Sequence, residues 1–447
     1  MQRYVDTLLA EIAASRVLPG GPLETVFFGG GTPSLLPPEL LARILEALDA
    51  RVGLAGGAEV SMEADPGTFD GPRLREYMRL GVTRLSVGVQ AFQQELLTAC
   101  GRGHNLADVR AAIDAVHEAG PPSWSLDLIS GLPGLTPDMW RESLQEAVAA
   151  GPGHVSVYDL QVEEGTPFER WRRAGRLALP PDDAAVEMYG TASELLGAAG
   201  FEHYEVSNYA RAGHRCAHNQ VYWLGLPYYA YGMGAASYLE GRRFTRPAKM
   251  RPYEAWVAEL AARAAGGVEL PLPGDCLPRE SPEELLLDTL MLRLRTADGL
   301  DLAALAAAYG PAAVRTVTAA LAPHERRGGV AAFDGEGRTA SLAEATFAAL
   351  KSAAAAAGKG PEPLPSLQAA GSSGAGAAAG ASAQRGAGEE GVAGSGRRGP
   401  RVRLADPQGF LLSNDIISDV FAAFDITESG RGQAAEEAGP AAALAQA

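Results

Sequence analysis

The chain has 447 residues and a formal net charge of −16, and 47% of its residues are hydrophobic. This length is sufficient for two or three domains with cores of their own. The negative charge argues against a nucleic-acid partner, because phosphate binding requires a basic surface. No apolar run reaches the ~20 residues that a membrane helix needs, so no membrane span is expected.

The N-terminal twelve residues and the cysteines indicate a reduced intracellular protein. Residues 1–12 have the mixed charge of an amphipathic helix and lack both a signal core and an arginine-rich transit pattern. Cys100, Cys216 and Cys276 are far apart, which predicts neither a disulfide framework nor a zinc ribbon. We therefore expect a cytoplasmic location.

Residues 1–210 alternate between short apolar runs and helical stretches. Val-, Ile- and Phe-rich runs predict strands near 25–28, 59–62, 85–89, 124–129 and 154–158. Capping signals and apolar spacing predict helices near 38–50, 70–80, 106–119, 137–150 and 182–199. This alternation predicts an α/β fold with a parallel sheet and crossover helices.

Polar residues or glycines follow several of these strands. Three glycines at 29–31 follow the first strand, and Glu63, Gln90 and Asp127 lie at or near the ends of the next three. Glycine allows close backbone approach and positive φ angles, and this end of a βα-repeating sheet is where ligands bind. If the three glycines are considered alone, the alternative is a tight turn that binds no ligand. Together, the residues predict a ligand site.

The remaining chain divides by composition. Residues 211–280 are rich in aromatic residues and irregular, and residues 281–351 are helical, with Glu284, Asp288 and Arg293 expected on the solvent side. Residues 352–400 form an Ala/Gly/Ser tract that lacks the apolar surface for folding, so we expect a disordered insertion. Residues 401–425 resume a strand and a helix of the same small domain, and 426–447 are expected to be a disordered tail.

Five motifs in this order resemble radical S-adenosylmethionine (SAM) proteins related to oxygen-independent coproporphyrinogen III oxidase. They are FGGGTPS at 28–34, EADPGT at 63–68, SVGVQAF at 86–92, GRGH at 101–104 and DLISGLPG at 127–134. The resemblance covers most of residues 1–350. It implies an incomplete parallel (β/α)6 barrel followed by a small C-terminal helical, winged-helix-like domain.

The resemblance also implies a SAM site. SAM presents an ammonium, a carboxylate and a ribose diol, which suit carboxylates, an arginine fork and bare glycine backbone. Each residue taken alone has an ordinary alternative, such as a strand-end cap or a solvated loop charge. The residues that the resemblance assigns to SAM are Gly30, Gly31, Thr32, Glu63, Gln90, Arg102 and Asp127.

The sequence departs from this family at the iron–sulfur cluster. The family holds a [4Fe–4S] cluster with a Cys-x3-Cys-x2-Cys run after its first strand, and no such run occurs here. We expect either a missing upstream segment, with the first strand and a targeting peptide for plastid or mitochondrion, or a loss of radical chemistry. The missing segment is favoured because a barrel without its first strand exposes an unpaired edge. No metal ligand or catalytic residue is assigned, and whether the chain is an enzyme stays open.

The run HNQVYW at 218–223 resembles the HemW branch of this family, haem-binding proteins regarded as haem chaperones. Imidazole is a common haem ligand and aromatic rings pack on porphyrins, so His218 and Tyr222 are the haem candidates. His214, Cys216 and His218 alternate, which on an extended segment puts them on one face. A structural loop and, third, a zinc site are the alternatives for these residues.

The resemblance therefore implies a haem chaperone that binds haem and SAM and serves haem-accepting proteins. An oxygen-independent coproporphyrinogen III oxidase acting on a porphyrin substrate, and an inactive homologue without a cluster, are the alternatives.

Overall fold

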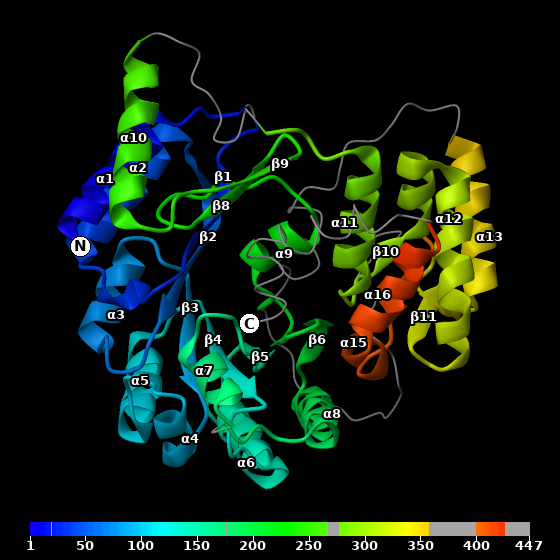
Figure 1. Cartoon of the computed structure of the whole chain (residues 1–447), viewed down its shortest axis with the longest axis horizontal. Coiled ribbons are helices and arrows are strands. Elements are labelled where there is room, and N and C mark those ends of the chain that lie inside the picture. The colour runs from blue at the N-terminus through cyan, green and yellow to red at the C-terminus, as the bar shows by residue number, and fades with distance from the viewer. Residues whose placement is uncertain (19, 176, 267–276, 357–398, 425–447) are drawn as a thin grey trace, which may run out of the picture.

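The computed structural model describes residues 1–18, 20–175, 177–266, 277–356 and 399–424. Two lobes are visible in Figure 1: a barrel lobe, residues 1–266, and a C-terminal lobe, residues 277–356 with 399–424. Most of the expected disordered insertion, the expected tail at 426–447 and Cys276 lie outside the described residues. Within those ranges, no helix is long and apolar enough to cross a membrane.

The barrel lobe is built on a curled sheet that, in the described residues, has the strand order β1-β2-β3-β4-β5-β7-β6. Strands β1 to β5 are parallel, which confirms the predicted parallel sheet, whereas β7 runs antiparallel to β5 and to β6. The strands are β1 (Leu23–Phe28), β2 (Leu54–Ala64), β3 (Arg84–Gln90), β4 (Ser123–Ser130), β5 (His154–Asp159), β6 (Glu202–Glu205) and β7 (Asn208–Ala210).

Helices cover the outer face of this sheet (Figure 1). Thr136 Oγ1 accepts a hydrogen bond from Met139 N at the start of α6, and Gly120 ends α5 in the left-handed conformation, as their sequence signals predict. The short α4 and α7 were not predicted. The helices are α2 (Pro38–Arg51), α3 (Gly71–Arg79), α4 (Gln94–Ala99), α5 (Leu106–Ala119), α6 (Pro137–Ala149), α7 (Pro167–Arg173) and α8 (Asp182–Ala198).

The two faces of the sheet differ in polarity. Alternate residues of β3, such as Leu85, Val87 and Val89, are fully buried against the helices, while Arg84 and Ser86 point to the inner side. A parallel sheet that is covered on both faces is normally apolar on both. The polar inner face therefore indicates a wall that faces a ligand.

Residues 211–266 return across the barrel lobe as α9 (Ala217–Trp223), β8 (Ala236–Leu239), β9 (Arg242–Thr245) and α10 (Met250–Ala265). Helix α9 contacts β1, β2 and the C-terminal lobe, and α10 packs on α1 (Gln2–Ala14). The Arg246 guanidinium donates from Nε to Glu11 Oε1 at 2.6 Å, and both side chains are buried. Glu11 Oε2 also accepts from Tyr253 Oη at 2.6 Å and from Gly232 N at 3.0 Å. This network fixes α1 to the end of the barrel lobe.

The C-terminal lobe is a helical layer on a small antiparallel sheet of order β10-β13-β11-β12. Its elements are α11 (Pro282–Leu294), β10 (Leu300–Asp301), α12 (Leu302–Arg326), β11 (Val330–Phe333), β12 (Thr339–Ala340), α13 (Leu342–Ala356), β13 (Arg401–Leu404), α15 (Gln408–Leu411) and α16 (Ser413–Ala422). Strand β13 lies between β10 and β11, and Ile416, Ile417 and Val420 are buried in the core that they share with α11 and α12. The segment after residue 400 is thus part of this lobe.

Two expectations for the C-terminal lobe were wrong. Helix α13 continues to Ala356, so residues 352–356 are helical and do not begin a disordered tract. Asp288 is half-buried and accepts from Arg243 Nη2 at 2.8 Å, instead of facing solvent. The partner comes from β9, 45 residues earlier, which local periodicity does not reveal.

We predict that Glu11→Ala lowers the free energy of unfolding by about 3–5 kcal/mol, because it leaves the buried Arg246 charge without its carboxylate. Urea unfolding monitored by circular dichroism measures the loss. Asp6→Ala is the control, since it removes an exposed carboxylate from the same helix that pairs with Arg43, and it should change stability little. Equal effects of the two substitutions would contradict the role given to the buried pair.

Candidate functional site

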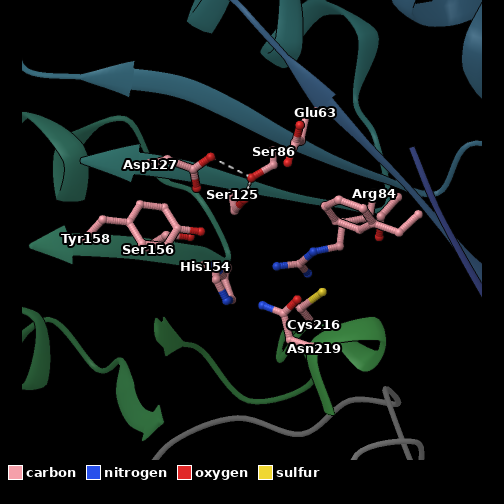
Figure 2. Close-up of a pocket in the computed structure, with 12 residues that line it drawn as sticks. Glu63, Arg84, Ser86, Ser125, Asp127, His154, Ser156, Tyr158, Cys216 and Asn219 are labelled. Atoms are coloured by element: carbon pink, nitrogen blue, oxygen red, sulfur yellow. Dashed lines mark hydrogen bonds between the residues drawn. The ribbon is translucent and has the colours of Figure 1, made fainter. Parts of the chain in front are cut away.

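A polar cavity of about 40 Å³ lies on the inner face of the sheet (Figure 2). Strands β1 to β5 supply most of its wall, and α9 closes the opposite side. This volume has room for a few water molecules, at roughly 10–15 Å³ each. Its lining residues are Phe27, Ser61, Glu63, Arg84, Ser86, Ser125, Asp127, His154, Ser156, Tyr158, Cys216 and Asn219.

The glycine turn after β1 leaves its backbone open. Gly30 and Gly31 have φ angles of 77° and 64°, which favour glycine. A Cβ atom built on either residue would meet no atom of the described chain within 4 Å. Gly30 N donates to Glu63 Oε2 at 2.9 Å, so the turn is fixed to the end of β2. The turn therefore combines a fixed conformation with free space beside the backbone.

Asp65 joins two of the predicted site residues. Thr32 Oγ1 donates to Asp65 Oδ2 at 3.2 Å, and Arg102 Nη2 donates to Asp65 Oδ1 at 2.8 Å. The Arg102 and Asp65 side chains are 30% and 33% exposed, so this ion pair is partly hydrated and easily exchanged. Sequence reasoning missed Asp65, although it lies in the motif at 63–68 that begins with Glu63.

Gln90 adopts an unusual backbone conformation at the end of β3. Its φ angle is 71°, which is uncommon for a residue with a side chain, and the register with β4 shifts between Gly88 and Gln90. Its Oε1 atom is buried without a hydrogen-bond partner in the part of the chain that the structure describes. Strained backbone and an orphaned polar atom are both typical of ligand sites.

Asp127 is held by serine hydroxyls from the neighbouring strands. Ser86 Oγ donates to Asp127 Oδ2 at 2.8 Å and lies 2.7 Å from Ser125 Oγ (Figure 2). Burial raises the pKa of Asp127, and hydrogen bonds from Ser156 and Ser86 partly oppose this. Over the described ranges, Oδ1 finds no partner and so remains available as an acceptor.

The site is acidic overall. Burial raises the pKa of Glu63, the hydrogen bond from Gly30 lowers it, and the nearby charges of Asp127 and Asp65 raise it further. Carboxylates that repel one another in this way favour a ligand with a positive group, because such a group relieves the repulsion. The structure thus brings Gly30, Gly31, Thr32, Glu63, Gln90, Arg102 and Asp127 to one end of the sheet.

Residues 214–218 do not form one extended segment, because α9 begins at Ala217. Cys216 is the N-cap of α9, and His218 lies in its first turn. Glu59 of β2 accepts from Ala217 N at 3.1 Å and from His218 N at 3.0 Å, so a half-buried carboxylate fixes the start of the helix. These contacts with Glu59 stabilise a helix at the point where the alternation of His214, Cys216 and His218 would suit an extended strand.

The three alternating residues have different partners. His214 Nδ1 lies 3.0 Å from Ser123 Oγ, and Cys216 Sγ lies 3.6 Å from Glu59 Oε1. His218 Nδ1 lies 2.9 Å from Thr25 Oγ1, and its Nε2 lies 2.9 Å from Tyr222 Oη. Within the described residues, no group of three or more His, Cys, Asp or Glu side chains is arranged to hold a metal ion.

The cysteines of the described chain do not fit an iron–sulfur cluster either. Burial, followed by the charge of Glu59, raises the pKa of Cys216 to about 12, whereas cluster ligation requires a thiolate. Cys100 is the C-cap of α4, and burial raises its pKa as well.

Sequence reasoning also missed the buried polar residues beneath the site. Arg84 is 3% exposed and donates from Nη1 to Ser123 Oγ and to His214 O, both at 3.0 Å. His154 Nε2 lies 2.8 Å from Tyr204 Oη. A period-two alternation of polar residues in β3 to β5 was the signal that could have revealed them.

The polar wall continues onto the β6–β7 hairpin. Asn208 pairs with Ser156 of β5, and Glu205 pairs with Asn208. Glu205 is fully buried and accepts from Ser207 N at 3.3 Å. Burial raises its pKa to about 7, although hydrogen bonds from Asn208 and Ser207 partly oppose the shift.

Comparisons with known proteins identify relatives of both lobes. Residues 2–147 match the Radical SAM superfamily, and residues 281–337 match the HemN C-terminal domain. The chain is 48% identical over 297 residues to the heme chaperone HemW of Synechocystis sp., covering 66% of this chain and 70% of the relative. It is 32% identical over 312 residues to the heme chaperone HemW of Bacillus subtilis, covering 69% and 80%.

A solved structure shows the same fold. Coproporphyrinogen III oxidase (HemN) from Escherichia coli, described as a radical SAM enzyme, aligns with a TM-score of 0.57 at 21% identity, covering 74% of this chain and 77% of that one. The likeness confirms the expected incomplete barrel with a C-terminal domain.

We predict that Gly88→Ala destabilises the protein by about 1–3 kcal/mol, because overpacking forces neighbouring side chains to move. The added Cβ would lie 2.9 Å from Gln90 Nε2, 3.1 Å from Asp65 Oδ1 and 3.3 Å from Arg102 Nη2. Gly190→Ala in α8 is the control, since its Cβ meets nothing within 4 Å of the described atoms and should stabilise the helix. Urea unfolding of both variants measures the change in stability. An unfolding midpoint of Gly88→Ala equal to that of the wild type would contradict the prediction.

We also predict that stability falls as the pH rises from about 4.5 to about 7, in part because of Glu205. Its raised pKa means that the folded state binds more protons than the unfolded state in this window, so deprotonation favours unfolding. Glu205→Gln should flatten this part of the profile and be more stable than the wild type at pH 8. Urea unfolding at several pH values tests the claim, and parallel profiles for the two proteins would refute it.

Proposed function

Because this chain belongs to the HemW-type radical SAM proteins, we propose that it is a haem chaperone that binds haem and SAM. The observation that carries the proposal is the 48% identity to a heme chaperone HemW over 70% of that relative's length. The polar strand-end site supports the SAM part, and α9 supports the haem part. Membership of the family implies SAM and a [4Fe–4S] cluster, but the described cysteines do not fit the cluster.

For SAM, we propose that the seven predicted residues hold its polar groups. The open backbone at Gly30 and Gly31 suits the methionine end, and the acidic cluster of Glu63 and Asp65 suits the ammonium group. Arg102 suits the carboxylate, for which it would exchange its hydrated pairing with Asp65. The free acceptor of Asp127 suits the ribose diol. When bound, SAM supplies a sulfonium centre and, with a reductant, a source of radicals.

For haem, we propose that α9 forms part of the binding surface through His218 and Tyr222. Both side chains are half-buried, and α9 itself lies between the sheet and the C-terminal lobe (Figure 1). The proposed partners are haem and haem-accepting proteins, and the proposed location is the cytoplasm. The proposed division into a barrel at 1–210, a connecting region at 211–280 and a C-terminal domain agrees with the two separate hydrophobic cores.

Coproporphyrinogen III oxidase is the second candidate function. The HemN C-terminal domain at 281–337 and the HemN-like fold favour it, but the structural likeness at 21% identity carries the fold alone. Titration of the purified chain with ferric haem, followed by an anaerobic assay for protoporphyrinogen, separates the two functions. A Soret band at one haem per chain without porphyrinogen decarboxylation is the expected result. Decarboxylation without haem binding would favour the oxidase.

We predict that Arg102→Ala and Asp127→Ala each weaken SAM binding by about 1–3 kcal/mol, because each removes a partner of a charged or polar ligand group. Isothermal titration calorimetry at millimolar SAM measures the change. Arg110→Ala and Asp114→Ala remove the same charges from the exposed side of α5 and should bind SAM like the wild type. Equal losses in all four variants would show a general charge effect instead of specific contacts.

A further inference from the structure

Arg84 is a buried cation that lacks a carboxylate partner. It is 3% exposed and lines the cavity on the inner face of the sheet. Its Nη1 atom donates to Ser123 Oγ and to His214 O, both at 3.0 Å. Within the described residues, Nε and Nη2 make no hydrogen bond, and no carboxylate forms an ion pair with the guanidinium. Because a buried charge without a counterion is costly, this arrangement indicates a ligand that supplies one.

The unbonded edge of Arg84 is one that binds a carboxylate elsewhere in this protein. Arg215 donates from Nε and Nη2 to the two carboxylate oxygens of Glu202, at 3.1 Å and 2.6 Å. This edge of a guanidinium offers two parallel N–H groups, which match the spacing of carboxylate oxygens. Arg84 has the same edge without such a partner, and Figure 2 shows its guanidinium directed toward His154 and Asn219.

His154 offers another donor beside the cavity. The ring is buried, lines the cavity, and has an Nδ1 atom without a hydrogen-bond partner in the described chain. Its Nε2 lies 2.8 Å from Tyr204 Oη, which itself accepts from Cys216 N at 3.4 Å. Among the described residues, Nε2 is the one acceptor that the structure gives to the phenol proton of Tyr204. Since burial lowers the pKa of His154 and keeps the ring neutral, the ring proton is on Nδ1.

Glu59 does not provide the missing counterion. Its carboxylate accepts from Ala217 N at 3.1 Å, from His218 N at 3.0 Å and from Ser61 Oγ at 3.3 Å. It is also absent from the residues that line the cavity. The negative charge of Glu59 is therefore stabilised by α9 and leaves the inner edge of Arg84 free.

Charge is distributed unevenly along the cavity. Arg84 and His154 are the first residues of β3 and β5, whereas Glu63 and Asp127 lie further along the strands. A negative group therefore fits best at the end that holds Arg84, away from the two carboxylates. Short hydroxyl side chains from four neighbouring strands leave space between the two ends: Ser61, Ser86, Ser125 and Ser156.

We propose that this cavity binds the carboxylate group of an organic acid, with Nε and Nη2 of Arg84 as its main donors and Nδ1 of His154 as a further donor. The volume of about 40 Å³, the space of a few water molecules, admits such a group. The site does not depend on the proposed binding of SAM or haem. A free small acid and a propionate side chain of haem share this chemistry.

Saturation-transfer NMR of the full chain with propionate tests the site. The wild type should bind propionate and should not bind propionamide, which has the same shape without the charge. Arg84→Lys keeps the positive charge but loses the paired N–H groups, so it should bind propionate about tenfold more weakly or worse. Arg211→Lys is the matched control, because Arg211 donates to Ala199 O outside the cavity, and it should bind like the wild type.

Asn219→Asp is a second test that changes few atoms. It adds a carboxylate to the cavity wall on α9, and this group should pair with Arg84 and abolish propionate binding. Circular dichroism melts check that each variant folds. Undiminished binding in Asn219→Asp or in folded Arg84→Lys would overturn the proposal. Equal affinities for propionate and propionamide, or displacement of propionate by equimolar chloride, would overturn it as well.

Hemin and hemin dimethyl ester, in which both propionates are blocked, distinguish the two sources of the carboxylate. If a haem propionate occupies the site, Arg84→Lys weakens the binding of hemin but not that of the ester, and propionate competes with hemin. If a free acid occupies it, hemin binds equally to the wild type and to Arg84→Lys. Failure of the wild type to bind hemin would overturn the proposed haem function, whereas propionate binding would still support the carboxylate site.

Discussion

The polar inner face of the parallel sheet is the constraint on which the rest of the structure depends. Buried carboxylates and an arginine on this face need partners, because an unpaired buried charge is costly. Helix α9 supplies such partners because it packs back against the sheet. Two backbone N–H groups in the first turn of α9 donate hydrogen bonds to the carboxylate of Glu59. The return segment is in turn fixed to α1 by the buried Glu11–Arg246 pair.

Helix α9 connects the two proposed binding regions. It presents Cys216 and Asn219 to the cavity on the inner face, while His218 reaches β1 at Thr25 and Phe27. Phe27 belongs to both regions, because it lines the cavity and stacks on His218. Any shift of α9 that accompanies haem binding therefore changes the wall of the cavity below the SAM cluster. The C-terminal lobe is attached on the far side of α9, and its Asp406 lies 2.6 Å from His203 of β6.

Local sequence signals predicted the parallel strands and their helices, because capping residues and apolar spacing act over a few neighbours. They failed where a distant partner decides the structure. The alternation of His214, Cys216 and His218 indicated an extended segment, but Glu59 stabilises the start of a helix there. The β6–β7 hairpin was missed because strands of four and three residues carry no clear period. The motifs located most of the candidate site, whereas Asp65, Arg84 and His154 emerged only from the packing of the strands.

The central claim is that the strand ends from Gly29 to Asp127 form one SAM site. Hydrogen–deuterium exchange of the full chain, with and without millimolar SAM, tests it most directly. If these strand ends bind SAM together, exchange slows at the glycine turn 29–32 and at residues 88–91 and 127–131, and it does not change in α12 and α13. Unchanged exchange at these three segments, or protection confined to the C-terminal lobe, would contradict it.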